Sequence, residues 1–261
     1  MSKTQKELAF LRDLYIETDW TERFTNIFDE NFKFSGEKKI LYINAGTGNH
    51  ALALRKKMKE DTEFFGVCEN NELLMIAKAK EAAVKAGVNF LKALPKEKFD
   101  TVVTDASFER PKNVKKFLSQ AIDASSKQVV CVLATAGSFG EIFSILWEIL
   151  FDLDLLEKSG EVERLISEIP TTSRLEDLVK DLDLSKIEIV TKNEHFDFES
   201  GEKFITAPLV ADFLLPAWLD FLDKKEQTRV KRKLVQTIDD NRNDLTFRFS
   251  VKATLLTGEK K

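Results

Sequence analysis

Cysteine, tyrosine, tryptophan and histidine are all scarce in this chain. Its 261 residues include 2 Cys, 2 Tyr, 3 Trp and 2 His. Cys68 and Cys131 each lie inside an apolar, strand-like run, and they form neither a spaced set of metal ligands nor a disulfide framework. We therefore expect both thiols to be core residues of a protein from a reducing compartment, and we expect no metal site.

Long hydrophobic runs are missing as well. The longest apolar neighbourhood, residues 142–156, is interrupted by Glu148, Asp152 and Asp154, so no stretch approaches the ~20 apolar residues that cross a bilayer. Residues 1–7 lack the basic stretch and the apolar region of a signal peptide. The sequence therefore predicts a cytoplasmic protein that does not insert into a membrane.

Positive charge is not in excess. The formal net charge is -4 at pH 7, which gives no general electrostatic reason to bind nucleic acid or an anionic membrane. A basic run at residues 224–233 is interleaved with Glu226 and followed by Asp239 and Asp240, a pattern typical of a solvated helix face. We expect no nucleic-acid partner.

What the chain has in plenty is apolar sequence in regular alternation. Hydrophobic residues make up 43% of it, enough for a large core. We predict strands at residues 40–44, 63–69, 88–91, 100–104, 128–134, 186–191 and 245–256. We predict helices at residues 5–33, up to about 59 after the first strand, 72–86, from about 112, 139–157, 162–169, 174–182 and about 202–240. Strands that are apolar throughout, separated by amphipathic helices, indicate a parallel sheet covered on both faces.

The predicted architecture is therefore α/β with a doubly wound sheet. No linker, repeat or low-complexity tract divides the sequence, so we predict one domain over residues 1–261. It would comprise an N-terminal helical arm (1–35), a ligand-binding half (36–135) and a second half (136–261). The second half would carry a helical insertion at about 202–240.

The most informative segment is the turn after the first predicted strand. An apolar run leads into Asn44, Ala45, Gly46, Thr47 and Gly48, and a helical pattern follows directly. This order places backbone N–H groups and a positive helix end where the polar or anionic part of a ligand can sit. Glycine matters there because a Cβ would hold the ligand away and disfavour positive φ.

A carboxylate follows this turn at a meaningful distance. Glu69 ends the second predicted strand, 23 residues after Gly46, the spacing at which an acid meets ribose hydroxyls in nucleotide-binding βαβ units. Asn70 can cap the next helix by itself, which leaves Glu69 free to accept hydrogen bonds. We therefore predict an adenosine-containing ligand. Ala51 completes a dinucleotide fingerprint, so a nicotinamide-dependent oxidoreductase is an alternative, although no second mononucleotide half is evident.

Residues 40–48, Glu69 and the strand-loop at 99–105 together resemble the motifs of class I S-adenosylmethionine-dependent methyltransferases, of the methyltransferase type 11-like kind. The resemblance extends over roughly residues 10–257. It implies a mostly parallel, seven-stranded, Rossmann-like sheet whose last strand is antiparallel. The helical insertion would then cover the substrate side of the sheet.

The first motif departs from the family pattern at two positions. The family usually has an acidic residue where Tyr42 stands and a glycine where Asn44 stands. The missing carboxylate removes part of the expected recognition of the methionine end. Asn44 adopts positive φ better than most residues, so we expect the turn itself to be kept.

The resemblance also implies a cofactor, S-adenosyl-L-methionine, and a set of residues that contact it. These are Asn44, Ala45, Gly46, Thr47, Gly48, Glu69, Asn70, Ala93, Leu94 and Asp105. Ala93 and Leu94 stand in the loop that lies beneath the adenine in the family. The acid that commonly binds the adenine amino group there is missing, so backbone groups would have to bind it.

Asp105 is the first candidate for a catalytic acid or base. It begins a loop where base-modifying amino-methyltransferases carry an acid or asparagine, two prolines and an aromatic residue. This chain keeps the acid and Phe108 but neither proline, and a capping role for Asp105 is the alternative. His195 is the second catalytic candidate, because it follows the sixth predicted strand in a region expected to border the substrate. We interpret His50 as a packing or capping residue.

The sequence thus predicts an enzyme that transfers a methyl group from S-adenosylmethionine to a small or lipophilic molecule. The 21 Phe residues favour an apolar pocket. One alternative is a catalytically inactive, cofactor-binding regulatory protein, prompted by Tyr42 and Asn44. The other is the NAD(P)-dependent oxidoreductase. The identity of the acceptor and the oligomeric state stay open at this point.

Overall fold

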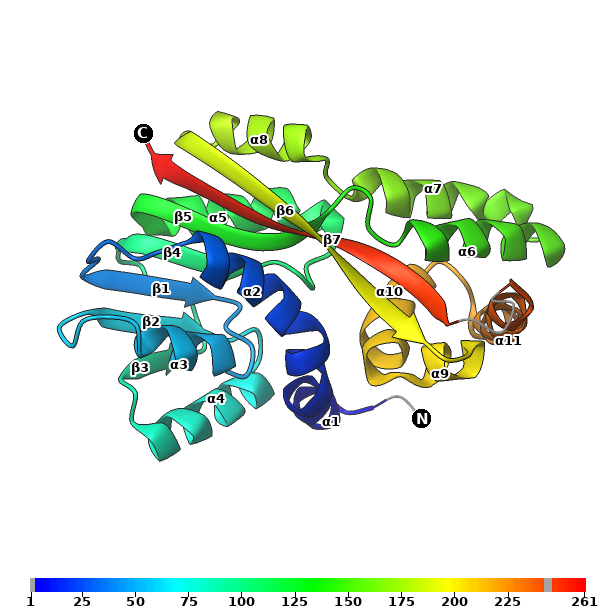
Figure 1. The fold of residues 1–261 in the computed structure, drawn as a ribbon, viewed down its shortest axis with the longest axis horizontal. Helices are drawn as coiled ribbons and strands as arrows, with labels where there is room; N and C mark the ends of the chain where they lie inside the picture. Colours follow the sequence, from blue (N-terminus) through cyan, green and yellow to red (C-terminus); the bar gives the residue numbers. More distant parts are fainter. Residues whose placement is uncertain (1–2, 242–245) are drawn as a thin grey trace. The chain divides into compact units, whose positions relative to one another are not determined.

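The computed structural model describes residues 3–241 and 246–261. Among these residues, seven strands form one sheet in the order β3-β2-β1-β4-β5-β7-β6 (Figure 1). The strands are β1 (Lys39–Ile43), β2 (Glu63–Val67), β3 (Val88–Leu91), β4 (Phe99–Asp105), β5 (Ser125–Thr135), β6 (Leu184–Phe198) and β7 (Phe247–Lys260). Six strands run parallel and the last is antiparallel. The predicted α/β, seven-stranded Rossmann-like sheet is confirmed.

The centre of the sheet is β1, which pairs in parallel with β2 and β4. Ile40 is level with Phe64 on one side and with Thr101 on the other. Leu41 and Tyr42 are 0% and 2% exposed, although they point to opposite faces of the strand. Burial on both faces explains why the strand is an unbroken apolar run.

The chain packs as two compact units. The first comprises Met1–Ala134, Thr171–Lys192 and Ala253–Lys261, and the second comprises Thr135–Pro170 and Asn193–Lys252. Strands β6 and β7 each contribute residues to both units. The single domain over 1–261, with its arm, its two halves and its insertion, stays a prediction.

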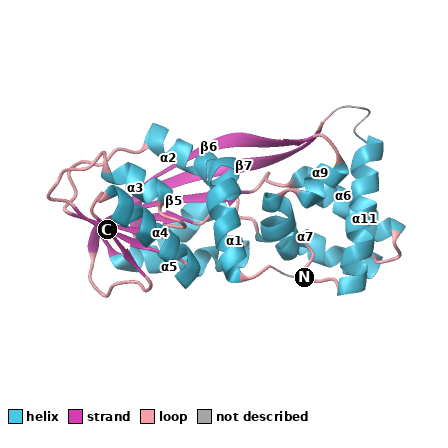
Figure 2. Cartoon of the chain, turned by 90° about the horizontal axis from the view of Figure 1, so that it is seen from below, coloured by secondary structure: helices cyan, strands magenta, loops and turns pink. Residues whose placement is uncertain are grey.

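Helices cover both faces of the strands in the first unit (Figure 2). They are α1 (Gln5–Leu11), the π-helix η1 (Arg12–Thr21), α2 (Glu22–Asn31), α3 (Asn49–Arg55), α4 (Asn71–Val84), the 3₁₀-helix η2 (Pro111–Asn113), α5 (Val114–Ala124) and α8 (Thr172–Asp181). On one face, Leu118 of α5 and Val179 of α8 pack on Val102 and Val129 of the sheet in one buried cluster. This core holds the carboxyl ends of β1, β2 and β4 in fixed positions.

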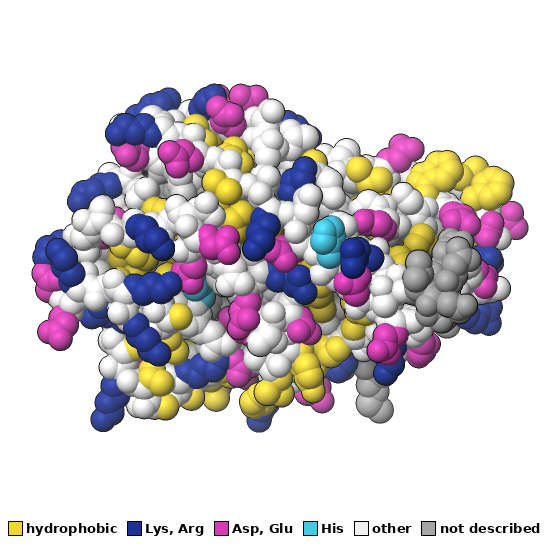
Figure 3. Space-filling view, in the orientation of Figure 1, with side chains coloured by type: hydrophobic (Ala, Val, Ile, Leu, Met, Phe, Trp, Pro, Cys, Tyr) yellow, Lys and Arg dark blue, Asp and Glu magenta, His cyan; other side chains and the backbone are white. Residues whose placement is uncertain are grey.

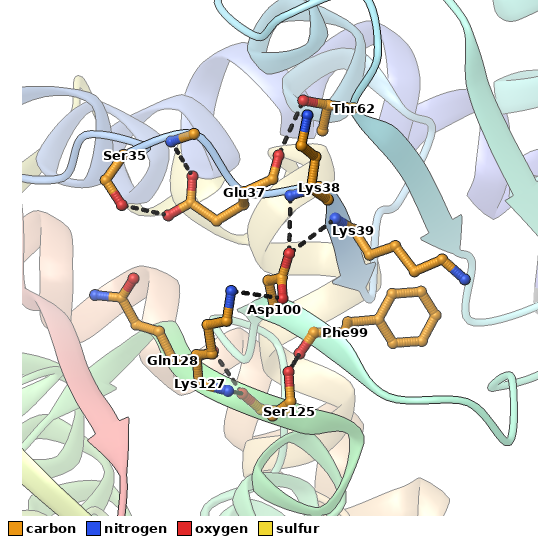
Figure 4. A network of polar contacts seen from close by, with 12 residues as sticks. Ser35, Glu37, Lys38, Lys39, Thr62, Phe99, Asp100, Ser125, Lys127 and Gln128 are labelled. Carbon is orange, nitrogen blue, oxygen red and sulfur yellow. Dashed lines mark hydrogen bonds and ion pairs between the residues drawn. The ribbon is translucent and has the colours of Figure 1, made fainter.

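The amino edge of the same sheet is tied together by Asp100 (Figure 4). Its Oδ2 accepts hydrogen bonds from the backbone N–H groups of Lys38 and Lys39, at 2.8 and 3.2 Å, and its Oδ1 lies 2.9 Å from Lys127 Nζ. A polar surface cleft of about 500 Å³ lies here, with Thr101 among its lining residues. These contacts join the starts of β1, β4 and β5.

The second unit is mainly helical. Its helices are α6 (Gly140–Asp152), η3 (Leu156–Lys158), α7 (Ser159–Glu168), α9 (Gly201–Thr206), the π-helix η4 (Leu209–Leu214), α10 (Leu215–Trp218) and α11 (Lys224–Asn241). Trp218 packs against Phe139 and Phe143, with ring centroids 5.1 and 5.9 Å apart, and Phe196 stacks on Phe249 at 4.8 Å. The abundant phenylalanine therefore builds a core in this unit. That the insertion covers the substrate stays a prediction.

Some element boundaries differ from the predicted ones, each for a local reason. The helix predicted to reach 157 ends at Asp152, because Asp154 adopts a left-handed conformation with φ 55°. Strand β6 is longer than predicted and includes His195, which was predicted to follow the strand. The polar residues of its second half hid it from a search for apolar runs. The last strand was predicted from Leu245, which lies outside the described residues; β7 continues to Lys260.

The remaining compositional predictions concern the surface and the cysteines. On the face that Figure 3 shows, acidic and basic side chains of the described residues are interspersed. Over residues 3–241 and 246–261, the helices are too short or too polar to cross a bilayer. Cys68 and Cys131 are free and 3% and 0% exposed, so their assignment to the core is confirmed.

Candidate functional site

The turn after β1 has the left-handed backbone expected of it. Asn44, Gly46 and Gly48 have φ of 57°, 57° and 86°, a region that glycine and asparagine tolerate best. A Cβ at Gly48 would stand 2.8 Å from Phe90 Cζ, so this position needs glycine for space as well as for conformation. Thr47 is 0% exposed.

The side chain of Asn44 links this turn to the loop after β4. Its Nδ2 donates to the backbone oxygen of Asp105 and to Glu109 Oε1, both at 3.1 Å. Ala45 N donates to Val67 O at 2.9 Å, which anchors the turn to the end of β2. The carboxyl ends of three neighbouring strands are thereby held together, and asparagine here contributes a contact that glycine would lack.

Glu69 lies directly beside the turn. Its Oε2 accepts a hydrogen bond from Gly46 N at 3.1 Å, and its Oε1 lies 2.6 Å from Arg12 Nη1 in an ion pair. The structure thus brings together the predicted acid and the predicted glycine turn. It also adds a residue that the sequence analysis did not single out, Arg12.

The other predicted cofactor contacts lie along the same edge. Asn70 caps α4, because its Oδ1 accepts from Leu73 N at 2.9 Å, and this confirms the capping role. Ala93 and Leu94 lie in the loop after β3, and Leu94 is 39% exposed. Their contacts with a cofactor stay predictions.

Asp105 ends β4 and is 4% exposed. Its Oδ1 accepts from Ser107 N at 2.8 Å, a local turn that matches the capping alternative. Burial raises the pKa of Asp105, against the hydrogen bonds from Ser107 and the positive charge of Arg12. Asp105 is therefore both a structural capping residue and a carboxyl group with a perturbed pKa beside the turn.

The N-terminal arm brings charged residues to this site. Arg12 and Glu17 both lie on the π-helix η1, where the i→i+5 pattern places residues five apart close together. Arg12 Cζ is 5.2 Å from the centre of the Phe108 ring, and Trp20 packs on the same ring at 5.1 Å. Although burial opposes it, the charges of Glu69 and Asp105 raise the pKa of Arg12. Sequence reasoning singled out neither Arg12 nor Glu17.

Glu17 is expected to make stability depend on pH. It is 7% exposed, and burial raises the pKa of its carboxyl group from 4.5 to about 7. A folded-state pKa above the unfolded value gives stability that is present below pH 4.5 and lost as pH rises through about 7. Replacing Glu17 by glutamine should therefore raise the free energy of unfolding at pH 8 by about 1–2 kcal/mol, and should change it little at pH 4.5.

Urea unfolding at both pH values measures this effect. Glu22→Gln is the matched control, because Glu22 is an exposed acid in the first turn of α2. If the Glu17 and Glu22 substitutions change the free energy of unfolding alike at both pH values, Glu17 does not titrate as a buried acid.

Tyr42, which replaces the usual family acid, belongs to a buried polar chain. Its hydroxyl lies 2.9 Å from His50 Nδ1, and His50 Nε2 lies 3.6 Å from Asp29 Oδ1. Burial raises the pKa of Tyr42, whereas His50 and then Lys57 lower that of Asp29 to about 2. His50 therefore packs against Tyr42, as the interpretation of it as a packing residue requires.

His195, the second catalytic candidate, belongs to the second unit. It lies in β6, and its Nδ1 is 3.2 Å from Ser250 Oγ, which in turn donates to Glu141 Oε1 at 2.7 Å. All three residues are in that unit. A catalytic role for His195 stays a prediction.

No protein-family model matches this sequence, and no curated protein matches it. Solved structures do. A SAM-dependent methyltransferase from Thiobacillus denitrificans, in complex with S-adenosyl-L-homocysteine, matches with a TM-score of 0.58 at 10% identity over 100% of both chains. Another from Geobacter sulfurreducens, with the same ligand, has a TM-score of 0.58 at 10% identity over 100% of this chain and 99% of that one. The YcgJ protein from Bacillus subtilis has a TM-score of 0.58 at 16% identity over 92% and 99%.

This chain has the class I methyltransferase fold. At these identities the likeness concerns the fold, and it transfers neither an acceptor nor the role of any residue. In this methyltransferase fold, β1, β2 and β4 end side by side, and the turn, Glu69 and Asp105 stand at those ends.

Proposed function

We propose that this protein binds S-adenosylmethionine at residues 44–48 and transfers its methyl group to a small or lipophilic acceptor. The observation that carries the proposal is the position of Glu69, whose carboxylate receives the N–H of Gly46 at 3.1 Å. Ligands of parallel sheets sit beyond the carboxyl ends of the strands, and a carboxylate there is a suitable acceptor for two ribose hydroxyls. The neighbouring structures with bound S-adenosylhomocysteine support the same ligand.

The charges of the site fit a cationic ligand. Among the described residues, carboxyl groups outnumber cations where the turn meets the arm: Asp13, Glu17, Glu69 and Asp105 lie around Arg12 and Lys80. S-adenosylmethionine, when bound, supplies a sulfonium methyl group as the electrophile. A positive sulfonium nearby would favour the ionised forms of Glu17 and Asp105, the two acids whose pKa burial raises.

The residues of this chain would orient the two reactants and exclude water from the site. Trp20 and Phe24 are 0% exposed and, with Phe108, form an aromatic wall beside the turn. Holding two reactants in line supplies much of the rate of a group transfer. Where the acceptor carries a proton on the atom that receives the methyl group, Asp105 or Glu17 would be the base that takes it.

S-adenosylhomocysteine is expected to raise the melting temperature of the protein. A ligand present at ten times its Kd, and bound only by the folded state, stabilises that state by about 1.4 kcal/mol. For a chain of this size we expect a shift of roughly 3–6 °C. Differential scanning fluorimetry and calorimetry with S-adenosylmethionine, S-adenosylhomocysteine and NAD(H) check this. Absence of both a shift and a binding heat for the first two ligands would contradict the proposal.

A catalytically inactive, cofactor-binding protein is the second candidate. The buried contact of Tyr42 with His50 favours it, because a neutral hydroxyl replaces the expected acid. This candidate would be supported if the protein binds S-adenosylmethionine but forms no S-adenosylhomocysteine with any acceptor tested. The oxidoreductase is disfavoured by the strand order, which ends β5-β7-β6 with an antiparallel last strand, whereas the dinucleotide-binding order is 3-2-1-4-5-6.

A further inference from the structure

The carboxylate of Glu69 is engaged on both oxygens by the protein itself. Gly46 N donates to one oxygen, and the guanidinium of Arg12 pairs with the other at 2.6 Å. The two side chains of the pair are only 11% and 22% exposed. A ribose that uses Glu69 must therefore compete with a partly buried, charge-assisted contact.

Arg12 also covers the turn in space. Its Nη2 would lie 3.3 Å from a Cβ placed on Gly46, and its Cζ and Nε would lie 3.6 Å from that atom. The guanidinium thus stands directly in front of Gly46, where the turn lets a ligand approach the backbone. A ligand that contacts both Gly46 and Glu69 has to displace it.

A displaced guanidinium needs another anion, because a buried unpaired charge is costly. Its Nε is buried and has no hydrogen-bond partner among the described residues, so the group keeps donor capacity for a further acceptor. Asp105 and Glu17 are the other acids that act on Arg12. Both are poor replacements, because burial disfavours their charged forms and Asp105 Oδ1 already accepts from Ser107 N. A carboxylate carried by the ligand fits the planar fork of the guanidinium.

We propose that Arg12 selects among adenosine ligands by their anionic end. It releases Glu69 to a ligand whose own carboxylate replaces Glu69 as the ion-pair partner of Arg12. The proposal rests on the proposed function above and adds to it a residue that determines specificity. A nucleoside without an amino-acid end must break the Arg12–Glu69 pair with no replacement. S-adenosylhomocysteine breaks the same pair but offers Arg12 a new partner.

The position of Arg12 in the arm suits this exchange. It is the first residue of η1, where the α-helical hydrogen bonding of α1 gives way to the π pattern. Such π segments are uncommon and often lie at functional sites. A change of register at this junction would move the side chain while the rest of the arm stays packed through Trp20 and Phe24, which are 0% exposed.

The test compares two ligands on four proteins by isothermal titration calorimetry. The ligands are S-adenosylhomocysteine and 5′-methylthioadenosine, which lacks the amino-acid end. The proteins are the parent, Arg12→Met, Arg12→Lys and Arg23→Met. Arg23 is the matched control, because it is an arginine of the same arm, in α2, and its Nε donates to the backbone oxygen of Asp19 at 3.0 Å.

Arg12→Met is expected to bind 5′-methylthioadenosine about tenfold more tightly than the parent and S-adenosylhomocysteine about tenfold more weakly. The preference for the larger ligand then falls about a hundredfold, whereas Arg23→Met leaves it unchanged. Tighter binding of the truncated ligand is the decisive signature, because a purely structural role for Arg12 would weaken both ligands together.

Unchanged or weaker binding of 5′-methylthioadenosine by a folded Arg12→Met protein overturns the proposal. Should this variant fail to fold, Arg12→Lys decides, since lysine keeps the charge but lacks the planar fork. We expect the preference of Arg12→Lys for S-adenosylhomocysteine over 5′-methylthioadenosine to fall at least about threefold. An unchanged preference overturns the proposal. A parent that binds neither ligand rejects the proposed function and this role together, whereas a parent that binds S-adenosylhomocysteine leaves only the role of Arg12 to be judged.

Discussion

Replacing Glu69 by glutamine is expected to weaken the binding of S-adenosylhomocysteine by about 10- to 150-fold. The substitution keeps the size of the side chain but removes the charge that strengthens its hydrogen bonds. A hydrogen bond to a charged group contributes about 1.5–3 kcal/mol, which corresponds to that range in affinity. Because Glu69 lies in the loop after β2 and its side chain is partly exposed, we expect the fold to survive the change. Calorimetric titration of the variant and the parent measures the ratio.

Glu72→Gln is the matched control for this experiment. Glu72 lies in the first turn of α4, close to Glu69 in sequence, and has no place in the proposed site. Its variant should bind the ligand as the parent does. If the Glu69 variant keeps its affinity within about threefold, which is under 1 kcal/mol, Glu69 is not the ribose ligand.

The sheet and its glycine turn were predictable from the sequence because their determinants are local. A fully buried strand such as β1 appears as an unbroken apolar run, and β3 was predicted at residues 88–91, its observed bounds. The positive φ of Asn44 followed from the conformational tolerance of asparagine. Each inference used only residues that are neighbours in the chain.

The ion pair that closes the candidate site was not predictable in this way. Arg12 and Glu69 are far apart in sequence, and their contact depends on how the arm docks on the sheet. The arm also forms a π-helix over Arg12–Thr21, which has no distinct pattern of apolar residues. An analysis by α-helical spacing therefore missed Arg12 and Glu17.

For Asp105 and Tyr42, the sequence alone could not decide between alternative roles. The sequence left Asp105 open as an acid, a base or a cap, and the structure shows the cap, with burial that also raises its pKa. Tyr42 looked like a defect in a family motif. Its contact with His50 shows that a compensating partner lies eight residues further along the chain, a pairing that only the packed structure displays.

The largest loss of stability is expected from Gly201→Ala in the second unit. A Cβ at this position would lie 2.4 Å from the backbone oxygen of Val235 and 2.7 Å from its Cα. Those atoms belong to the middle of α11, so no side chain can rotate away to make room. Gly201 N also donates to Asp239 Oδ1 at 2.9 Å, and moving α9 outward would break that bond.

We therefore expect Gly201→Ala to lower the free energy of unfolding by about 3 kcal/mol or more, at the upper end of overpacking effects. Gly160→Ala is the control, with an expected effect of opposite sign, since Gly160 lies in α7 and no described residue has an atom within 4 Å of the added methyl group. Alanine there should stabilise the protein by up to about 1 kcal/mol, because glycine disfavours helices. Urea unfolding followed by tryptophan fluorescence suits both variants, since Trp147 and Trp218 report on this unit. Equal stability of the two variants would mean that α9 and α11 pack less closely at Gly201 than the 2.4 Å contact requires.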